Sequence, residues 1–503
     1  MLNGFEKPHV VAVPFPALGH AIPLLEYCNL LASYGLAVTF VTTAANAPSL
    51  KLQMAHAISS GFDIRLTVLP TPQVEGLPKG VESFEQVPSE QTDLIFDLVA
   101  NLEHPFNRWL EGQLEGREAP VCIMHDVLLG WNMELAQKQN IVKVAFDTYG
   151  AFALTLLRSA WLSYSHNALK EEDDSFVLSL GLPTPLRLHK HEIHSVMFQA
   201  MPMKRTGRIH SAIQGWGMLV NMFEELEPEY LQHLRNLTGK KVWSIGPVLP
   251  SACFEGAVRV STQGKMADIS EDKLLQWLDS QSSCSVAYIS FGSRTFLTEE
   301  QSKALAGGLE ASEQPFIWAI KVSPEVKHTQ SDLARTYLPE GFQERTKNRG
   351  LLIWGWVPQL VILSHSSVGA FMSHCRWNSM LESVTLGVPL ITWPMIADQH
   401  FNSKLAVESG IGIQVCEHID GIADKERVKE GVTLVLSKDK GKQMKRQAEK
   451  LKDMARKAVA CGGSSNANLQ DFVTDIQKLQ KARTAAREQS LKAPKDHCVP
   501  KFI

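Results

Sequence analysis

Residues 356–399 read WVPQLVILSHSSVGAFMSHCRWNSMLESVTLGVPLITWPMIADQ, and this stretch determines the predicted fold. Two short apolar runs, Val368–Ser373 and Val388–Trp393, flank an amphipathic segment, which is the strand–helix–strand order of a parallel sheet. Polar residues follow the end of each run. Because ligands bind at the carboxyl ends of parallel strands, the stretch predicts a ligand site at this edge of the sheet.

The same alternation of apolar runs and amphipathic helices extends outward from this stretch along most of the chain. It predicts an α/β fold of two facing, Rossmann-like, doubly wound domains, because 503 residues are too many for one ordinary core. We expect domains at 1–250 and 271–482, a polar linker at 251–270 and a disordered polar tail at 483–503. The expected strands are Val10–Val13, Ala37–Thr42, Ile64–Leu69, Pro120–His125 and Ile141–Phe146 in the first domain, and Ser285–Phe291, Pro315–Val322, Gly350–Trp354, Val368–Ser373 and Val388–Trp393 in the second.

Composition excludes several classes of function. The formal net charge is −3, with no basic excess, so neither a nucleic-acid partner nor a membrane-surface partner is expected. No apolar run is long enough to span a bilayer, and the first strand comes too early for a signal peptide. The eight cysteines are scattered, which favours reduced thiols in a cytoplasmic protein. His189, His191 and His194 lack carboxylate or cysteine support, so no metal site is expected there.

Three residues of the stretch suit a nucleoside. Trp356 follows a strand, where an indole can stack on a flat base, and Gln359 can offer its amide to the base or the ribose. Glu382 lies on the helix face of Asn378, where a carboxylate can accept both ribose hydroxyls. The alternatives are a core tryptophan and a solvated helix glutamate.

Three other residues suit a diphosphate. His374 stands at a sharp strand-to-helix turn, where free N–H groups and the helix dipole favour an anion. Asn378 and Ser379 follow in the first helical turn, where ordinary helix caps are the alternative. After the next strand, Asp398 and Gln399 can bind two or three sugar hydroxyls. The stretch therefore predicts a site for a nucleotide diphosphate bonded to a sugar.

Sugar transfer to an alcohol also needs a base, and His20 is the candidate. It stands between the strand Val10–Val13 and a helix expected at Ile22–Ser33, where the helix N-terminus disfavours the imidazolium form. Asp126, at the end of another strand, can hold the second ring nitrogen. Its alternative role is a helix N-cap.

These motifs together resemble the donor-sugar box of the plant UDP-dependent glycosyltransferases, which are family 1 glycosyltransferases. The resemblance covers nearly the whole chain. Outside the box it includes Gly-His-x-x-Pro-Leu at His20, Asn-Met-Phe-Glu-Glu-Leu-Glu-Pro-Glu-Tyr at 221–230, Ser-Ile-Gly-Pro at 244–247 and Phe-Ile-Trp-Ala at 316–319. It implies the GT-B type of fold, in which the first domain binds the acceptor, the second binds the UDP-sugar, and the last helix crosses back to the first domain.

The resemblance also implies residue roles. His20 would be the base and Asp126 its partner, and no metal or cofactor would be needed because the UDP-sugar is a co-substrate. The positions that would contact the UDP-sugar are Thr148, Ser293, Trp356, Val357, Gln359, His374, Trp377, Asn378, Ser379, Glu382, Asp398 and Gln399.

The reaction implied is a displacement that inverts the anomeric carbon. Gln399 goes with glucose in the family, so UDP-glucose is the expected donor, and UDP-rhamnose, UDP-xylose and UDP-galactose are alternatives. The expected acceptor is a small lipophilic hydroxyl compound such as a phenolic or flavonoid, because such a cleft is apolar with few polar anchors. We expect a monomer.

Arg376 departs from the family, which has glycine between the equivalents of Cys375 and Trp377. A side chain there can force a strained backbone, which costs on the order of 1–3 kcal/mol. A guanidinium near the diphosphate would return roughly 1.5–3 kcal/mol. We expect strain to dominate, so that Arg376→Gly raises kcat/KM for UDP-glucose. A weakly active nucleotide-sugar binding protein is the other possible consequence.

Overall fold

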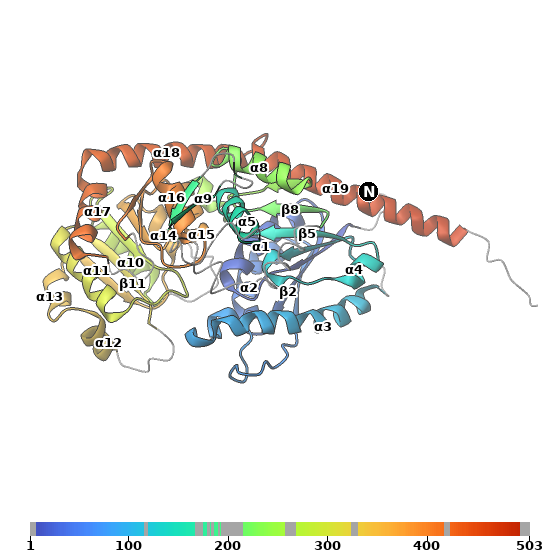
Figure 1. Ribbon diagram of the computed structural model, residues 1–503, viewed down its shortest axis with the longest axis horizontal. Coiled ribbons are helices and arrows are strands. Elements are labelled where there is room, and N and C mark those ends of the chain that lie inside the picture. The colour runs from blue at the N-terminus through green and yellow to red at the C-terminus, as the bar shows by residue number, and fades with distance from the viewer. Residues whose placement is uncertain are drawn as a thin grey trace, which may run out of the picture.

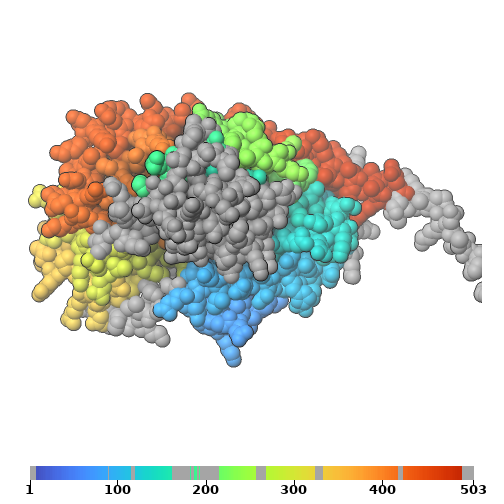
Figure 2. Space-filling model, viewed as in Figure 1, coloured from blue at the N-terminus to red at the C-terminus, as the bar shows by residue number. Residues whose placement is uncertain are grey.

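The computed structural model describes residues 7–114, 119–165, 175–178, 182, 186–189, 192, 215–256, 268–322, 330–416 and 423–492. They form two α/β units that lie side by side along the long axis, the first blue to green and the second yellow to orange (Figure 1). The surfaces of the two units occupy opposite sides of the space-filling view (Figure 2). The predicted fold class, two doubly wound α/β domains, is confirmed.

The first unit is built on a seven-stranded parallel sheet with the order β3-β2-β1-β4-β5-β8-β9. Every residue of β1, β2 and β4 is buried, because helices cover both faces of the sheet. Its elements are β1 (His9–Val13), α1 (Leu18–Ser33), β2 (Ala37–Thr43), α2 (Ala47–Ser59), β3 (Ile64–Leu69), α3 (Ile95–Leu114), β4 (Cys122–Asp126), α4 (Glu134–Lys138), β5 (Val142–Asp147), α5 (Ala151–Ser165), β8 (Gly217–Val220), α8 (Pro228–Thr238) and β9 (Lys241–Ser244), with a separate antiparallel pair, β6 (Ser175–Leu178) and β7 (Leu186–His189).

The second unit has a six-stranded parallel sheet with the order β12-β11-β10-β13-β14-β15. Its elements are α10 (Glu271–Asp279), β10 (Val286–Ser290), α11 (Glu299–Ser312), β11 (Phe316–Ile320), α12 (Gln330–Tyr337), α13 (Phe342–Thr346), β12 (Gly350–Trp354), α14 (Gln359–Ser364), β13 (Val368–Ser373), α15 (Trp377–Leu386), β14 (Leu390–Thr392), α16 (Gln399–Glu408), β15 (Gly412–Gln414), α17 (Lys425–Ser437) and α18 (Asp439–Val459).

The strand order reverses once in each sheet, between β1 and β4 and between β10 and β13. Ligands of doubly wound sheets bind beyond the carboxyl ends of the strands at such a reversal. His20 and Asp126 follow β1 and end β4, while Ser293 and His374 follow β10 and β13. The topology therefore aims the predicted base and the predicted phosphate contacts at the same inter-domain space.

The last helix, α19 (Ser464–Lys492), returns to the first unit, where Figure 1 shows it beyond β8 and α8. Phe472 and Ile476 join the apolar core beneath α1 and β2. Asp471 accepts a hydrogen bond from the indole of Trp243 at 2.8 Å and one from Lys241 at 3.0 Å. The C-terminal segment therefore ties the two units together.

Helix α1 begins four residues earlier than the expected start at Ile22, so Pro23 lies in its second turn and does not mark the boundary. Proline has no N–H, so the carbonyl of Gly19, four residues earlier, has no helical donor. That carbonyl instead accepts a hydrogen bond from the Asn378 side chain at 2.6 Å, across the two units. His20 consequently lies inside the first turn of α1.

Two expectations about irregular segments need correction. The expected linker at 251–270 contains a short helix, α9 (Ala252–Glu255), and residues 257–267 lie outside the described residues. The expected tail at 483–503 is helical up to Lys492 as part of α19, because this segment is rich in good helix formers and Arg483 donates to the carbonyl of Ala119 at 3.2 Å. No helix among the described residues is long and apolar enough to cross a membrane.

Candidate active site

An open cleft of about 950 Å³, solvent included, separates the two units where the reversal points face each other. The first unit contributes the start of α1 and the segment after β3, and the second contributes the loop after β10, the loop after β12 and the first turns of α15. The lining residues are Ala17, Leu18, Gly19, Ile22, Phe84, Glu85, Gly292, Ser293, Arg294, Thr295, Trp356, His374, Arg376, Asn378, Ser379 and Glu382.

The predicted base and its partner are in contact. Nδ1 of His20 lies 2.8 Å from Oδ2 of Asp126, which is almost fully buried. The Thr148 hydroxyl lies 3.4 Å from the same ring nitrogen. Because the carboxylate can only accept, Nδ1 carries the proton in the neutral ring and Nε2 keeps its lone pair. Nε2 makes no hydrogen bond with any described residue and can therefore accept a proton.

Asp126 fills both roles that its sequence position suggests. Its Oδ1 accepts the backbone N–H of Leu128 at 2.9 Å, which caps the short turn after β4, while Oδ2 holds His20. The cap fixes the carboxylate, and the carboxylate in turn fixes the imidazole. The predicted pair therefore has the geometry of a preorganised base.

His374 stands at the end of β13 with its ring buried against the loop after β10. Burial and the nearby Arg376 guanidinium lower the pKa of His374 to about 3, so the ring is neutral at physiological pH. A side chain at Gly292, whose φ is +79°, would come within 2.6 Å of the His374 Nε2 atom. Glycine is therefore required beside the ring, and Ser293 follows it at the rim of the cleft.

Trp356 lines the cleft, and its backbone is held by a residue that precedes the stretch 356–399 in the chain. Asp268 donates its N–H to the Trp356 carbonyl at 3.0 Å and accepts the Trp356 N–H through its side chain. The Val357 side chain is buried in the core, so only its backbone can meet a ligand. Two hydrogen bonds thus hold the backbone of the loop after β12, and the Trp356 indole lines the cleft.

Gln359 connects the other nucleoside candidates. Its side-chain oxygen accepts the Tyr288 hydroxyl at 3.0 Å, while its amide nitrogen contacts Glu382 and lies 3.4 Å from the Ser379 hydroxyl. Glu382 and Ser379 are buried, and both line the cleft. The structure therefore brings these predicted residues together as one hydrogen-bonded network.

Trp377 lies away from the cleft, although the resemblance implied a donor contact. Its indole is fully buried between the units, donates to the Asn221 carbonyl at 2.6 Å and packs against Gly150, where an added Cβ would come within 2.5 Å of the ring. Sequence proximity to the phosphate candidates did not reveal this role. The indole joins the two units, and only its backbone N–H reaches the site, where it bonds Asp398.

Asp398 and Gln399 are also fully buried, and their side chains already hold the local backbone. Asp398 accepts from the Asn402 side chain at 2.6 Å, and Gln399 accepts the N–H groups of Met395 at 2.8 Å and Ile396 at 3.0 Å. Among the residues that the structure describes, none hydrogen-bonds Oδ1 of Asp398 or Nε2 of Gln399. Each residue therefore keeps one buried polar atom that a sugar hydroxyl can satisfy.

The expected strain at Arg376 is absent. Arg376 has φ −63° and ψ 146°, an ordinary extended conformation, and it is the N-cap residue of α15. The left-handed residue of this turn is Cys375, with φ +62°. The prediction that Arg376→Gly would relieve strain is therefore wrong, because the sequence placed the unusual dihedral one residue too late.

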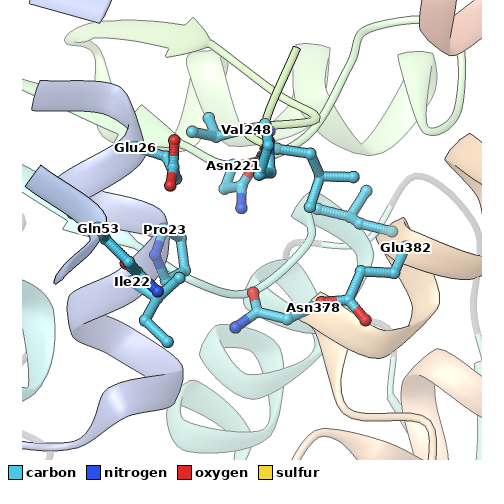
Figure 3. Close-up of a pocket in the computed structure, with 11 residues that line it drawn as sticks. Ile22, Pro23, Glu26, Gln53, Asn221, Val248, Asn378 and Glu382 are labelled. Atoms are coloured by element: carbon cyan, nitrogen blue, oxygen red, sulfur yellow. Dashed lines mark hydrogen bonds between the residues drawn. The ribbon is translucent and has the colours of Figure 1, made fainter. Parts of the chain in front are cut away.

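A smaller cavity of about 420 Å³, solvent included, adjoins the cleft and shares Ile22, Asn378 and Glu382 with it. Asn221 and Asn378, from opposite units, point into it, with Glu26 on the side of α1 (Figure 3). Burial raises the pKa of Glu26 to about 7. The walls are mixed polar and apolar, so this cavity provides room for water between the units.

Four residues that position the site were missed from sequence. Glu85 accepts the first N–H of α1 at 2.8 Å, and Arg294 donates to the Val87 carbonyl at 2.8 Å across the cleft. Asp268 and Tyr288 support Trp356 and Gln359. None belongs to a local motif, because each acts on a residue far away in the chain. Of the three histidines judged not to bind metal, His189 ends β7, and the other two lie outside the described residues.

Comparison with known proteins identifies the class that this fold and cleft define. The family described as UDP-glucuronosyl and UDP-glucosyl transferase matches residues 194–446, and the glycosyltransferase N-terminal domain matches residues 6–250. The chain is 36% identical over 487 residues to UDP-glycosyltransferase 73C3 of Arabidopsis thaliana, covering 94% of this chain and 96% of the relative. It is 35% identical to the scopoletin glucosyltransferase of Nicotiana tabacum, covering 93% and 98%. The chain belongs to the UDP-glycosyltransferase family.

Solved structures of plant glycosyltransferases have the same fold as this chain. The Glycyrrhiza uralensis enzyme UGT73P12, complexed with glycyrrhetinic acid 3-O-monoglucuronide, superposes with a TM-score of 0.84 at 27% identity, covering 97% of this chain and 99% of that one. Arabidopsis thaliana UGT89C1 complexed with UDP-L-rhamnose gives 0.72 at 29% identity, covering 94% and 99%. Phytolacca americana UGT2 complexed with UDP-2fluoro-glucose and pterostilbene gives 0.74 at 26%, covering 94% and 100%. The GT-B type of fold and the glycosyltransferase class are confirmed.

Proposed function

We propose that this glycosyltransferase moves glucose from UDP-glucose to a hydroxyl of a small lipophilic acceptor, a phenolic or flavonoid, with inversion at the anomeric carbon. The observation that supports this most is the 2.8 Å contact between His20 and Asp126, next to Gly19, which lines the cleft between the units. A binding protein without transfer activity would have no use for a buried carboxylate held against an imidazole at this place.

The chemistry follows from the geometry. The acceptor hydroxyl gives its proton to Nε2 of His20 while its oxygen forms a bond to the anomeric carbon. The bond from that carbon to the phosphate oxygen breaks on the opposite face, and UDP leaves with the electron pair. Asp126 stabilises the imidazolium that forms. Attack from the face opposite the leaving group is what inverts the anomeric centre.

The donor site is proposed from the contacts around α15. The indole of Trp356 stacks on uracil, and Gln359 and Glu382 bind the ribose through the network that already joins them. Ser293, His374 and Ser379 surround the diphosphate at the N-terminus of α15, where the helix dipole favours an anion. Thr148 and the free atoms of Asp398 and Gln399 face the sugar.

Donor and acceptor identities rest on relatives. One relative is named for glucosylation of scopoletin, and the Phytolacca structure holds a fluorinated UDP-glucose with pterostilbene, whereas a rhamnosyl donor occupies UGT89C1. Glucose with a phenolic acceptor is therefore the first choice, and rhamnose the second. The proposal includes a monomeric cytoplasmic enzyme that needs no metal or cofactor. The seven described cysteines, all free thiols, support a reducing compartment.

The test uses purified protein, a panel of phenolic acceptors and a panel of UDP-sugars with product detection. His20→Ala should lower turnover roughly 10²–10⁴-fold, because it removes the base. UDP affinity should stay nearly constant, since the nucleotide contacts belong to the other unit. Wild-type turnover by the alanine variant would show that His20 is not the base, and absence of product with every donor would refute the function.

A further inference from the structure

Arg294 of the second unit holds a segment of the first unit across the cleft. It stands in the loop after β10, directly after Ser293, and both residues line the cleft. Nη1 of Arg294 donates to the Val87 carbonyl at 2.8 Å, and the guanidinium carbon lies over the Phe84 ring, 4.6 Å from its centre. Cations are attracted to the face of an aromatic ring at such a distance. The side chain that follows a predicted phosphate contact is therefore bound to the other unit.

Residues 84–87 in turn hold the start of α1. The N–H of Phe84 donates to the Pro16 carbonyl at 2.8 Å. Oε1 of Glu85 accepts the N–H of Leu18, the first residue of α1, at 2.8 Å. A carboxylate at this place satisfies one of the free N–H groups of a helix N-terminus and interacts favourably with the helix dipole. The segment that the guanidinium holds thus fixes the helix turn that carries the proposed base.

Aromatic rings extend this path to His20 itself. The Phe15 ring lies 6.1 Å from the Phe84 ring, edge to face, and 5.2 Å from the imidazole of His20, measured between ring centres. Phe15 is almost fully buried, so its ring cannot move without displacing its neighbours. A continuous series of packed groups therefore leads from the loop after β10 to the base.

The proposed base and the donor contacts belong to different units, so contacts between the units must set their separation. A misplacement of about 1 Å can lower a rate on the order of 10²-fold. The hydrogen bond from Asn378 to the Gly19 carbonyl connects α15 to the turn that carries His20. A single contact leaves that turn able to rotate about it. The contacts of Arg294 supply a second attachment, from the loop after β10.

We propose that Arg294 is a positioning residue that fixes the His20 imidazole relative to the anomeric carbon of the bound donor. It acts through residues 84–87 and the Phe15 ring, and it touches no reacting atom. The inference rests on the proposed function and adds no chemical step, because His20 still takes the proton and the bonds that form and break are the same. Loss of the guanidinium should therefore lower turnover without removing a donor contact.

The test compares Arg294→Ala and Arg294→Lys with wild type in the full chain, after thermal unfolding shows that each protein is folded. Lysine keeps a cation for the Phe84 ring and an N–H donor for the Val87 carbonyl, but it lacks the planar group that serves both at once. Arg345→Ala is the matched control. That arginine also belongs to the second unit and pairs with Glu310, but it is not among the residues that line the cleft.

We expect Arg294→Ala to lower kcat for glucose transfer to a phenolic acceptor by roughly 10–100-fold. KM for UDP-glucose and the calorimetric Kd of UDP should stay close to the wild-type values, since no donor contact is lost. Arg294→Lys should recover part of the turnover, and Arg345→Ala should behave as wild type. Phe84→Leu should lower kcat by itself but add little to Arg294→Ala, because residues that act through one contact are not additive.

A second readout needs no transfer. Histidine-selective isotope labelling gives the NMR signals of the imidazole rings, and His20→Ala identifies the signal of His20. Arg294→Ala should shift or broaden that signal, because the groups packed against the ring lose their attachment to the second unit. Arg345→Ala should leave it in place.

Two results would overturn this assignment. Wild-type kcat in Arg294→Ala, or an unchanged His20 signal, would show that the guanidinium does not position the base. A weaker Kd for UDP at unchanged kcat would make Arg294 a ligand of the diphosphate instead. Neither result touches the proposed glucosyl transfer, which fails only if wild type yields no product with any UDP-sugar. In that case the His20 signal still decides whether Arg294 positions the ring.

Discussion

Replacement of Trp377 by phenylalanine separates a structural role from a donor-binding role. The variant keeps an aromatic ring but lacks the N–H that the buried Asn221 carbonyl accepts at 2.6 Å. An unsatisfied buried acceptor costs about 1–3 kcal/mol, and the space left beside Gly150 adds roughly 1 kcal/mol. The free energy of unfolding should therefore fall by about 2–4 kcal/mol, which corresponds to a Tm lower by roughly 2–4 °C when a chain of 503 residues unfolds as one unit. UDP affinity should be unchanged.

The assay is differential scanning calorimetry beside UDP titration. Trp354→Phe is the matched control, because that indole is half-buried and makes no hydrogen bond with a described residue, so its loss of stability should be smaller. A Trp377→Phe protein that melts like wild type but binds UDP roughly tenfold more weakly would refute the reasoning. The indole would then be a ligand contact.

Three further predictions use other contacts of the site. Asp126→Asn should lower turnover by about 10²–10⁴-fold at unchanged UDP affinity, since the His20 imidazolium loses its partner; steady-state kinetics with normal turnover would contradict it. Glu227 caps α5, and burial raises its pKa from 4.5 to about 7, so the folded protein holds an extra proton and the free energy of unfolding falls as pH rises between these values. This contribution is on the order of 3 kcal/mol. Denaturant titrations at several pH values give the free energy of unfolding as a function of pH, and Glu227→Gln should make it depend less on pH between 4.5 and 7. An unchanged pH dependence would exclude Glu227 as its source. Gln399→Ala leaves the N–H groups of Met395 and Ile396 without an acceptor and removes the amide proposed to face the sugar, so it should lower Tm and weaken the binding of UDP-glucose more than that of UDP; an equal change in the affinity for both ligands would leave Gln399 a purely structural role.

Sequence alone predicted the sheets well, for a physical reason. Strands buried on both faces are nearly continuous apolar runs, so β1, β2, β10 and β13 begin and end within about one residue of their predicted positions. The polar residues that follow such strands must gather at one edge. This rule is why His20, Asp126, Ser293 and His374, which follow or end β1, β4, β10 and β13, could be predicted to lie at sheet edges that face each other.

Long-range contacts were beyond the sequence. Trp377 donates to a residue 156 positions away, and nothing in its sequence neighbourhood distinguishes an indole packed between the units from one that contacts the UDP-sugar. A different limit applies to Gln399, whose oxygen holds the N–H groups of Ile396 and Met395, three and four residues earlier, because the conformation of that loop follows no periodic pattern in the sequence. Dihedral angles were a further limit, because a family glycine at position 376 suggested a strained residue there, while Cys375 takes the left-handed conformation.

The missing N–H of Pro23 has a consequence for exchanging domains between relatives. It frees the Gly19 carbonyl for Asn378, so the peptide unit next to His20 is bonded directly to the helix that faces the donor. A first domain without proline at position 23 would satisfy that carbonyl within its own helix and compete with Asn378. Compatibility between halves of different enzymes thus depends on Pro23 and Asn378, which are 355 positions apart in the chain. Pro23 leaves the Gly19 carbonyl without a helical donor, and Asn378 supplies one.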